Sequence, residues 1–189
     1  MKLLSQRPML IGLFLVALMA ATRMHHFGSA LHLPDASLAV FLLAGFFITS
    51  PLLLAGLLLE AAALDYVAIT HLGVNDFCVT SAYWFLIPTY AVLWFAGRYY
   101  ARIHQHSLRS LGVFSGLSVA ALSVAFFISN SAFYWLSGRY ANTNAAEYFA
   151  RAAEYYAPYL TGGLLYLACA AALYAVSSIR IPTAAKSGQ

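Results

Sequence analysis

Apolar runs and short polar stretches alternate along the whole chain. A helix needs about 20 residues to cross the hydrocarbon core of a bilayer, and most of the runs approach that length. The runs cover about residues 8–22, 36–49, 52–70, 82–97, 111–136 and 157–178. We interpret them as membrane-spanning helices. The pattern therefore predicts an all-α integral membrane protein, with a single transmembrane domain over residues 1–189 and a bundle of six helices.

The number of spans depends on the short second run, which is followed by Thr49-Ser50-Pro51. Proline can end one helix and occupy the first position of the next, so Pro51 predicts a helical hairpin over residues 36–70. The alternative is one long, kinked helix over the same residues. That alternative gives five spans and places the two termini on opposite sides of the membrane.

Composition supports a membrane protein. Of the 189 residues, 62% are hydrophobic and only 8% are charged, whereas about a quarter of the residues of a soluble domain are charged. The first 22 residues resemble a signal peptide, because Lys2 and Arg7 precede an apolar run. No small-x-small cleavage site follows, so we expect a retained first helix.

The basic residues favour six spans with both termini in the cytoplasm. Seven of the ten then lie inside and three outside, as the positive-inside rule requires. The inside set is Lys2, Arg7, Arg98, Arg102, Arg109, Arg180 and Lys186, and the outside set is Arg23, Arg139 and Arg151. This distribution explains the net charge of +4 better than a nucleic-acid partner does. We expect a monomer in the lipid bilayer, with no nucleic-acid partner.

The polar residues that could bind a ligand or react lie mostly on the outer side of this topology. Asp65 lies near the outer end of the third span, where a carboxylate marks a functional site or pairs with a basic residue. Glu60 lies deeper on the same span and is the weaker candidate. Cys78 follows in the loop GVNDFCVTSAYW and becomes a thiolate only with help from nearby cations. Cys169, about 16 Å into the last span at 1.5 Å per residue, has the character of a small apolar residue.

Other polar residues allow two interpretations each. His26 follows the first span and either enters a pocket or bonds to lipid headgroups. Arg151 lies four residues after Glu147, which is typical of a solvated helix surface, but it can also hold a ligand. His104 and His106 lack neighbouring metal ligands, so we interpret them as part of a solvated inner loop.

The order and spacing of five of these residues resemble a known family. A six-span bundle with an outer ligand site is similar to the S-components of energy-coupling factor transporters. Within that class the chain resembles the BtuM family of predicted cobalamin transporters. The resemblance rests on His26, Asp65, Cys78, Tyr83 and Arg151.

The resemblance implies uptake of cobalamin across the bacterial inner membrane, with the binding site facing the periplasm. Cobalamin would bind base-off, and the Cys78 thiolate would be an axial ligand of its cobalt. His26, Asp65, Tyr83 and Arg151 would contact the rest of the molecule. The family is associated with decyanation of cyanocobalamin. The resemblance implies transport by the chain alone. The alternative is transport through a shared energy-coupling module, for which the helix face carrying Ala17 and Ala21 is a candidate.

Two other functions remain open. In the first, the protein is a membrane-embedded thiol enzyme resembling exosortase transpeptidases. Cys78 is then a nucleophile helped by His26 or Arg151. In the second, the chain is a structural membrane subunit in which these residues have no chemical role. The chain contains no phosphate-binding GxxxxGK loop, so it does not hydrolyse ATP by that route.

Overall fold

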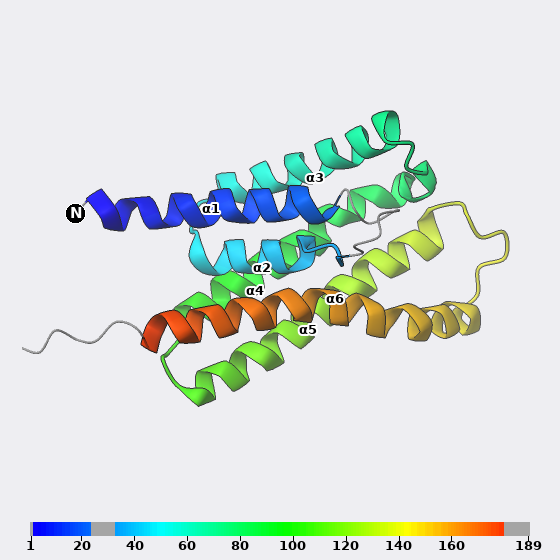
Figure 1. The fold of residues 1–189 in the computed structure, drawn as a ribbon. Coiled ribbons are helices and arrows are strands. Elements are labelled where there is room, and N and C mark those ends of the chain that lie inside the picture. The colour runs from blue at the N-terminus through cyan, green and yellow to red at the C-terminus, as the bar shows by residue number, and fades with distance from the viewer. Residues whose placement is uncertain (1, 24–32, 180–189) are drawn as a thin grey trace, which may run out of the picture.

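The computed structural model describes residues 2–23 and 33–179, which form six α-helices and no strand. Two short 3-10 helices, η2 and η3, lie between α3 and α4. Figure 1 shows the six α-helices gathered into one bundle. Their bounds are α1 Lys2–Arg23, α2 Ser37–Phe47, α3 Pro51–His71, η2 Asp76–Cys78, η3 Ser81–Phe85, α4 Leu86–Ile103, α5 Leu108–Leu136 and α6 Ala145–Ile179.

The prediction of a helical hairpin over residues 36–70 is confirmed. α2 ends at Phe47, Ile48 has extended backbone angles, and Pro51 is the first residue of α3. The break follows from Pro51, which has no N–H to donate and cannot continue a preceding helix. The chain therefore has six helices rather than five, and α1 begins at the end of the bundle where α6 finishes (Figure 1).

Several predicted boundaries differ from the structure, since α1 begins at Lys2 rather than 8 and α4 ends at Ile103 rather than 97. α4 begins at Leu86, because the preceding residues of the predicted span form η3. α6 begins twelve residues before the predicted position 157, at Ala145. Asn144 starts this helix by accepting a hydrogen bond from the Glu147 N–H at 2.9 Å. Its first turns are polar, so the apolar pattern did not include them.

α2 is the centre of the bundle. Eight of its eleven residues are buried, and at 1.5 Å per residue it is only about 16 Å long, too short to cross the hydrocarbon core alone. Glycines let α2 and α4 approach backbone to backbone. A methyl group at Gly45 would overlap the Trp94 carbonyl, and one at Gly97 would overlap the Leu42 carbonyl. Close approach at small residues is a common way to pack membrane helices.

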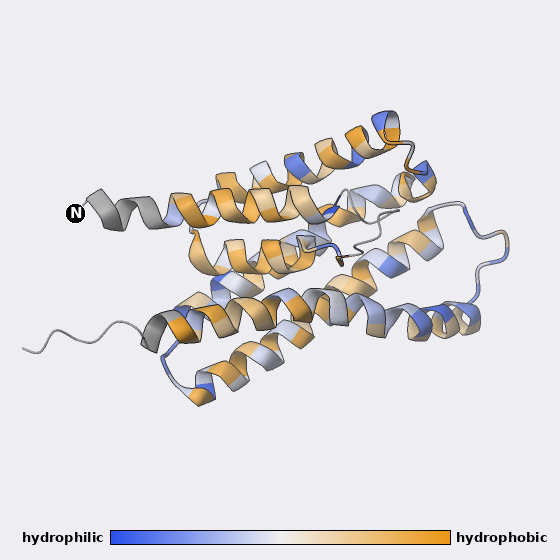
Figure 2. Ribbon diagram, viewed as in Figure 1, coloured by the Kyte–Doolittle hydropathy of each residue, from blue (hydrophilic) through white to orange (hydrophobic). Residues whose placement is uncertain are grey.

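Three helices are long and apolar enough to cross a membrane, namely α3, α5 and most of α6. Large apolar side chains on them face outward, including Leu59, Val124 and Leu173. Figure 2 shows hydrophobic residues along the length of the bundle and hydrophilic ones concentrated at its connections and in the first turns of α6. An apolar exterior between polar ends is the distribution expected of a protein surrounded by lipid.

Two ends of the bundle carry the polar chemistry. We call the half of the bundle that contains the end of α1, the α3–α4 connection and the start of α6 the Arg23 end. We call the opposite end, where α4 finishes and α5 begins, the His104 end. The α3–α4 connection containing Cys78 lies at the Arg23 end, at the right of Figure 1.

Candidate functional site

Arg23, the last residue of α1, joins α1 to α2, α3 and α4. Its guanidinium donates Nε to Asp65 Oδ1 and Nη2 to Asp65 Oδ2, both at 2.7 Å, in a two-pronged ion pair between α1 and α3. Nη1 donates to the Tyr90 hydroxyl at 2.8 Å and to Ser37 Oγ at 2.9 Å. Asp35 lies 3.3 Å from Nη1. We call these five residues the Arg23 network. Because the Arg23 side chain is only 9% exposed, its charge needs these partners.

Asp65 retains some capacity to accept further hydrogen bonds. Tyr83, in η3, donates its hydroxyl to Asp65 Oδ2 at 2.6 Å. Burial and this hydrogen bond raise the pKa of Tyr83, so the phenol remains a neutral donor at physiological pH. A carboxylate offers about four acceptor positions and three are used here. Asp65 therefore pairs with a basic residue, which was one of the two expectations from the sequence, and it also holds the Tyr83 side chain.

The Cys78 loop is fixed by several local interactions. Gly73, at φ +68°, turns the chain after α3, and Asn75 accepts the Phe77 N–H at 2.7 Å. Phe77 packs against Phe133 on α5, and the Arg139 guanidinium lies 4.8 Å from the centre of the Phe77 ring. These contacts hold the adjacent Cys78 at the surface of the Arg23 end.

Cys78 is an exposed free thiol whose surroundings favour the protonated form. Partial burial and the negative charge of Asp65 raise its pKa, and the positive charge of Arg139 opposes the shift. The cation near Cys78 is thus Arg139, which the sequence marked only as an outer basic residue. Cys169 is also free, so no disulfide joins the two cysteines.

Arg151 lies at the same end of the bundle but has its own partners. Its Nε donates to Glu147 Oε1 at 3.1 Å on the same helix, and its guanidinium lies 4.7 Å from the centre of the Tyr140 ring. Both side chains of the ion pair are 40% exposed. Tyr140 in turn packs on Phe133, which contacts Phe77. Arg151 therefore connects to the Cys78 loop through aromatic rings rather than directly.

Two further candidates have different outcomes. His26 lies outside the described residues, so its predicted role stays a prediction. Glu60 lies on α3, and its Oε2 is buried with no hydrogen-bond partner among residues 2–23 and 33–179. Its predicted status as a weaker candidate is unchanged, because no described contact gives it a chemical task.

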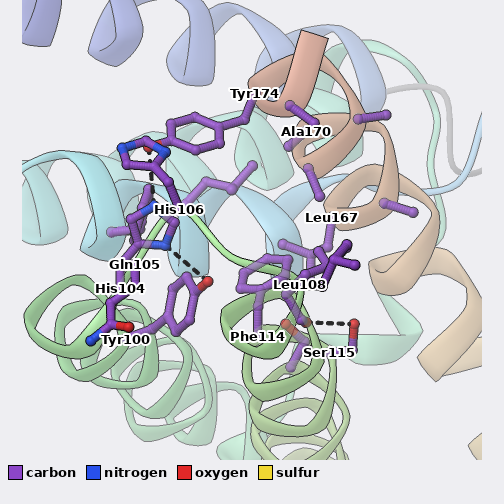
Figure 3. Close-up of a pocket in the computed structure, with 18 of the residues that line it drawn as sticks. Tyr100, His104, Gln105, His106, Leu108, Phe114, Ser115, Leu167, Ala170 and Tyr174 are labelled. Carbon is purple, nitrogen blue, oxygen red and sulfur yellow. Dashed lines mark hydrogen bonds between the residues drawn. The ribbon is translucent and has the colours of Figure 1, made fainter. Parts of the chain in front are cut away.

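The loop at the His104 end is exposed over residues 105–109, as expected, but His104 itself is half-buried and hydrogen-bonded. His104 shares hydrogen bonds with the Tyr100 hydroxyl through Nδ1 at 2.9 Å and with the Tyr174 hydroxyl through Nε2 at 3.0 Å. His106 stacks on the Tyr174 ring at 5.8 Å between centres. Burial and the neighbouring His106 lower the pKa of His104, which favours a neutral ring. Figure 3 shows these side chains at the edge of a cavity.

The chain matches no protein-family model and no curated protein sequence. Within the described part of the chain, no group of three or more His, Cys, Asp or Glu side chains is placed to hold a metal ion. The site must therefore be judged from its own geometry, which combines an exposed thiol, a tyrosine bonded to a carboxylate, and a nearby arginine.

Proposed function

We propose that this protein binds cobalamin at the Arg23 end and carries it across the bacterial inner membrane, with Cys78 as an axial ligand of cobalt. The observation that supports this most is the placement of Asp65, Tyr83 and Cys78 at one end of an apolar helical bundle. Asp65 and Tyr83 are in direct contact, and the Asp65 charge acts on the thiol. The BtuM family, as the sequence suggests, combines these residue types in one site.

The proposed topology has six spans, an S-component-like fold, cytoplasmic termini and the Arg23 end facing the periplasm. Arg98 and Arg102 on α4 and Arg109 on α5 belong to the half of the bundle near the His104 end. This is the arrangement that the positive-inside rule favours. Asp65, Asp76 and Glu147 are all on the opposite half.

One protein ligand is sufficient for cobalt in this chemistry, because the corrin ring already occupies the equatorial positions. A thiolate is a soft ligand suited to such a metal, and metal binding favours loss of the thiol proton. In the protein without cargo, the raised pKa keeps Cys78 mainly as a thiol. Binding would then replace the S–H bond with an S–Co bond and release one proton.

Decyanation can be written as ligand exchange at cobalt. The Co–C bond breaks, the electron pair leaves with cyanide, and the Cys78 sulfur supplies a pair to cobalt. The thiol proton neutralises the cyanide, so the products are the Cys78–cobalt bond and hydrogen cyanide. The oxidation state of cobalt does not change in this step.

The other site residues have roles in holding the cargo. Cobalamin is fringed with amides and carries a phosphate. Asp65 can accept one amide N–H while keeping its bonds to Arg23 and Tyr83. The Arg139 guanidinium contacts the Phe77 ring in the Cys78 loop, whereas Arg151 contacts Tyr140 and Glu147. We therefore assign Arg139 a contact with an amide carbonyl or the phosphate. Arg151 and His26 are proposed as contacts farther from cobalt.

The test is to purify the protein from membranes supplied with cyanocobalamin and to record its visible spectrum. We expect a retained corrinoid whose band positions show thiolate coordination. Cys78→Ala should lose that signature, whereas Cys169→Ala should keep it. A protein that retains no corrinoid in any preparation contradicts the proposal.

The same preparation addresses the thiol-enzyme alternative. A nucleophilic cysteine is normally activated by a lowered pKa or an adjacent base. The raised pKa of Cys78 and the ion pair that engages Arg151 both disfavour that function. An acyl-thioester on Cys78, detected by mass spectrometry without bound corrinoid, would support the enzyme instead.

A shared energy-coupling module remains part of the proposal as one of two transport routes. Ala17 and Ala21 are exposed on the same face of α1, so this small-residue motif is free to contact another membrane protein. Uptake of cobalamin into vesicles containing only this chain would show solitary transport. Uptake that requires an added module would show the coupled route.

A further inference from the structure

A cavity of about 880 Å³ lies at the His104 end, far from the proposed cobalamin site. Its size is within the range of small-molecule sites. Five parts of the chain line it: the ends of α2 and α4, the α4–α5 connection, the first half of α5 and the last half of α6. Figure 3 shows Leu167 and Ala170 on one side and Tyr100, His104 and His106 on another.

The lining has two chemical parts. Apolar side chains of α2, α5 and α6, such as Phe47, Phe114 and Leu167, form most of the wall. Polar groups gather at the α4–α5 connection, where His104, His106 and their neighbours lie. None of the described residues that line it is Asp, Glu, Lys or Arg. A wall of this kind suits an amphiphile whose long apolar part lies along the helices and whose polar part reaches the connection.

The contact between α5 and α6 shows what is missing at the cavity. Two side-chain hydrogen bonds join the helices toward the Arg23 end. Ser131 Oγ bonds to the Tyr148 hydroxyl at 2.7 Å, and Ser123 Oγ bonds to the Tyr156 hydroxyl at 2.8 Å. The same register places Thr161 opposite Ser118, but the Thr161 hydroxyl donates to the backbone carbonyls of Ala157 and Pro158 at 3.0 and 3.1 Å. The register then continues toward the His104 end. There α6 carries Leu164 and a series of alanines, and the cavity opens.

Ser118, on α5, differs from the serines around it in its hydrogen bonding. It belongs to the cavity wall and is 1% exposed, yet its Oγ has no hydrogen-bond partner among the described residues. Other serines of α5 behave differently. Ser115 and Ser123, for example, donate to backbone carbonyls one turn earlier at 3.1 and 2.7 Å. Buried hydroxyls normally have a partner, so Ser118 marks a place for an oxygen that residues 2–23 and 33–179 do not supply.

We propose that this cavity binds one ester-linked membrane lipid, with an ester carbonyl oxygen accepting a hydrogen bond from Ser118. The polar head then lies at the connection that contains His104 and His106, and an acyl chain fills the apolar part of the cavity. Ser118 lies about 16 Å along the helix from Ser107, at 1.5 Å per residue, so the ester is well inside the wall. The absence of charged lining residues means that recognition rests on the ester and the chain rather than on headgroup charge. This site does not depend on the cobalamin proposal.

The test uses defined lipids with and without the carbonyl. The full chain is exchanged into detergent micelles that contain equal amounts of diacyl and dialkyl phosphatidylcholine of the same chain length, and retained lipid is measured by native mass spectrometry. We expect one retained lipid, with the diacyl form favoured about threefold to tenfold, the effect of one neutral hydrogen bond. Ser118→Ala should remove the preference. Ser115→Ala, on the same wall, should keep it because Ser115 already donates to Leu111.

A second pair of variants tests the cavity itself. Ala171→Trp fills the space between the helices and should abolish retention of the lipid. Ala62→Trp, at an exposed position of α3, should leave it unchanged. Equal retention of diacyl and dialkyl lipid by the unmodified protein, or retention by Ala171→Trp at the level of Ala62→Trp, would overturn the proposal. Corrinoid binding measured in parallel separates this result from the outcome at Cys78.

Discussion

The two ends of the bundle stabilise their polar groups by different interactions. At the Arg23 end, full charges are brought inside and each is matched, with Arg23 bonded to Asp65, Tyr90 and Ser37 at 2.7 to 2.9 Å. At the His104 end, the hydrogen-bonded groups are neutral rings and hydroxyls, of which Tyr100 is buried and His104 half-buried, and they border an open cavity. Ion pairing joins the helices around Arg23, whereas a cavity opens between the helices at the His104 end.

This difference has a physical origin. A buried charge is stable only with partners, so the Arg23 network holds its helices in direct contact. Neutral hydrogen bonds are weaker and local, so they allow helices to separate where small residues replace large ones. The difference predicts that substitutions at the Arg23 end act mainly on stability, and that those beside the cavity act mainly on what it contains.

The largest effect is expected from Asp65→Ala. The change removes two hydrogen bonds from a guanidinium that is 9% exposed and one from Tyr83. Loss of one partner of a buried pair costs about 3 to 5 kcal/mol. Thermal unfolding in detergent should show a large decrease in midpoint temperature. The matched control is Glu147→Ala, which breaks an ion pair whose side chains are both 40% exposed and should cost under about 1 kcal/mol. Equal effects of the two substitutions would mean that the Arg23 network is not the main stabiliser of its end.

A smaller loss of stability is expected from Gly97→Ala in the tightly packed part of the His104 half. The added methyl group overlaps the Leu42 carbonyl, which belongs to backbone and cannot move aside easily. Overpacking of this kind costs about 1 to 3 kcal/mol. Gly112→Ala, on α5, has open space around the new methyl group and should be neutral or slightly stabilising. Comparable midpoints for the two variants in the same detergent would contradict the close packing of α2 on α4.

Part of this architecture could be predicted from sequence because it depends on local properties. Pro51 divides α2 from α3, and the apolar runs identify all six helices. The polar beginning of α6 did not follow from hydropathy, because its order comes from the Asn144 cap and from packing. The Arg23 network was also missed. Its residues are separated by up to 67 positions, and Arg23 was read only as an outer charge, although an arginine at the end of an apolar run facing two aspartates was a usable signal.

The cavity could not have been predicted from single residues. His104 and His106 were interpreted as a solvated loop, because no metal ligands lie near them in sequence. Their hydrogen bonds and stacking depend on Tyr174, about 70 positions away. The regular spacing of Ser123, Ser131, Tyr148 and Tyr156 was present in the sequence, but its meaning needs the register of α5 on α6.

A modest effect is expected from Tyr100→Phe at the His104 end. The Tyr100 hydroxyl contacts the Ser110 carbonyl, Ser110 Oγ and His104 Nδ1 at 2.9 to 3.0 Å, and its side chain is buried. Loss of a neutral hydrogen bond costs about 1 kcal/mol. The neighbouring Tyr99 is exposed, so Tyr99→Phe is a matched control that should leave the unfolding midpoint unchanged. A loss for Tyr100→Phe as large as that for Asp65→Ala would remove the energetic contrast between the two ends.

The smallest energetic effect concerns the Cys78 thiol, and it is best measured as reactivity. In a Cys169→Ala background, the rate of alkylation by iodoacetamide follows the fraction of thiolate. Burial and Asp65 raise the Cys78 pKa, so the rate should increase with pH and reach its midpoint above the value of about 8.5 for an ordinary cysteine.

Removal of the opposing cation should move that midpoint further. Because Arg139 lowers the Cys78 pKa, Arg139→Gln should shift the alkylation midpoint to higher pH and slow the reaction at pH 7.5, whereas Arg139→Lys should restore it. Arg102→Gln removes the same charge near the other end of α4 and should have no effect, because an exposed charge far from the thiol is screened by salt. A midpoint that falls in Arg139→Gln, or that moves equally in Arg102→Gln, would show that the charges near Cys78 do not set its reactivity.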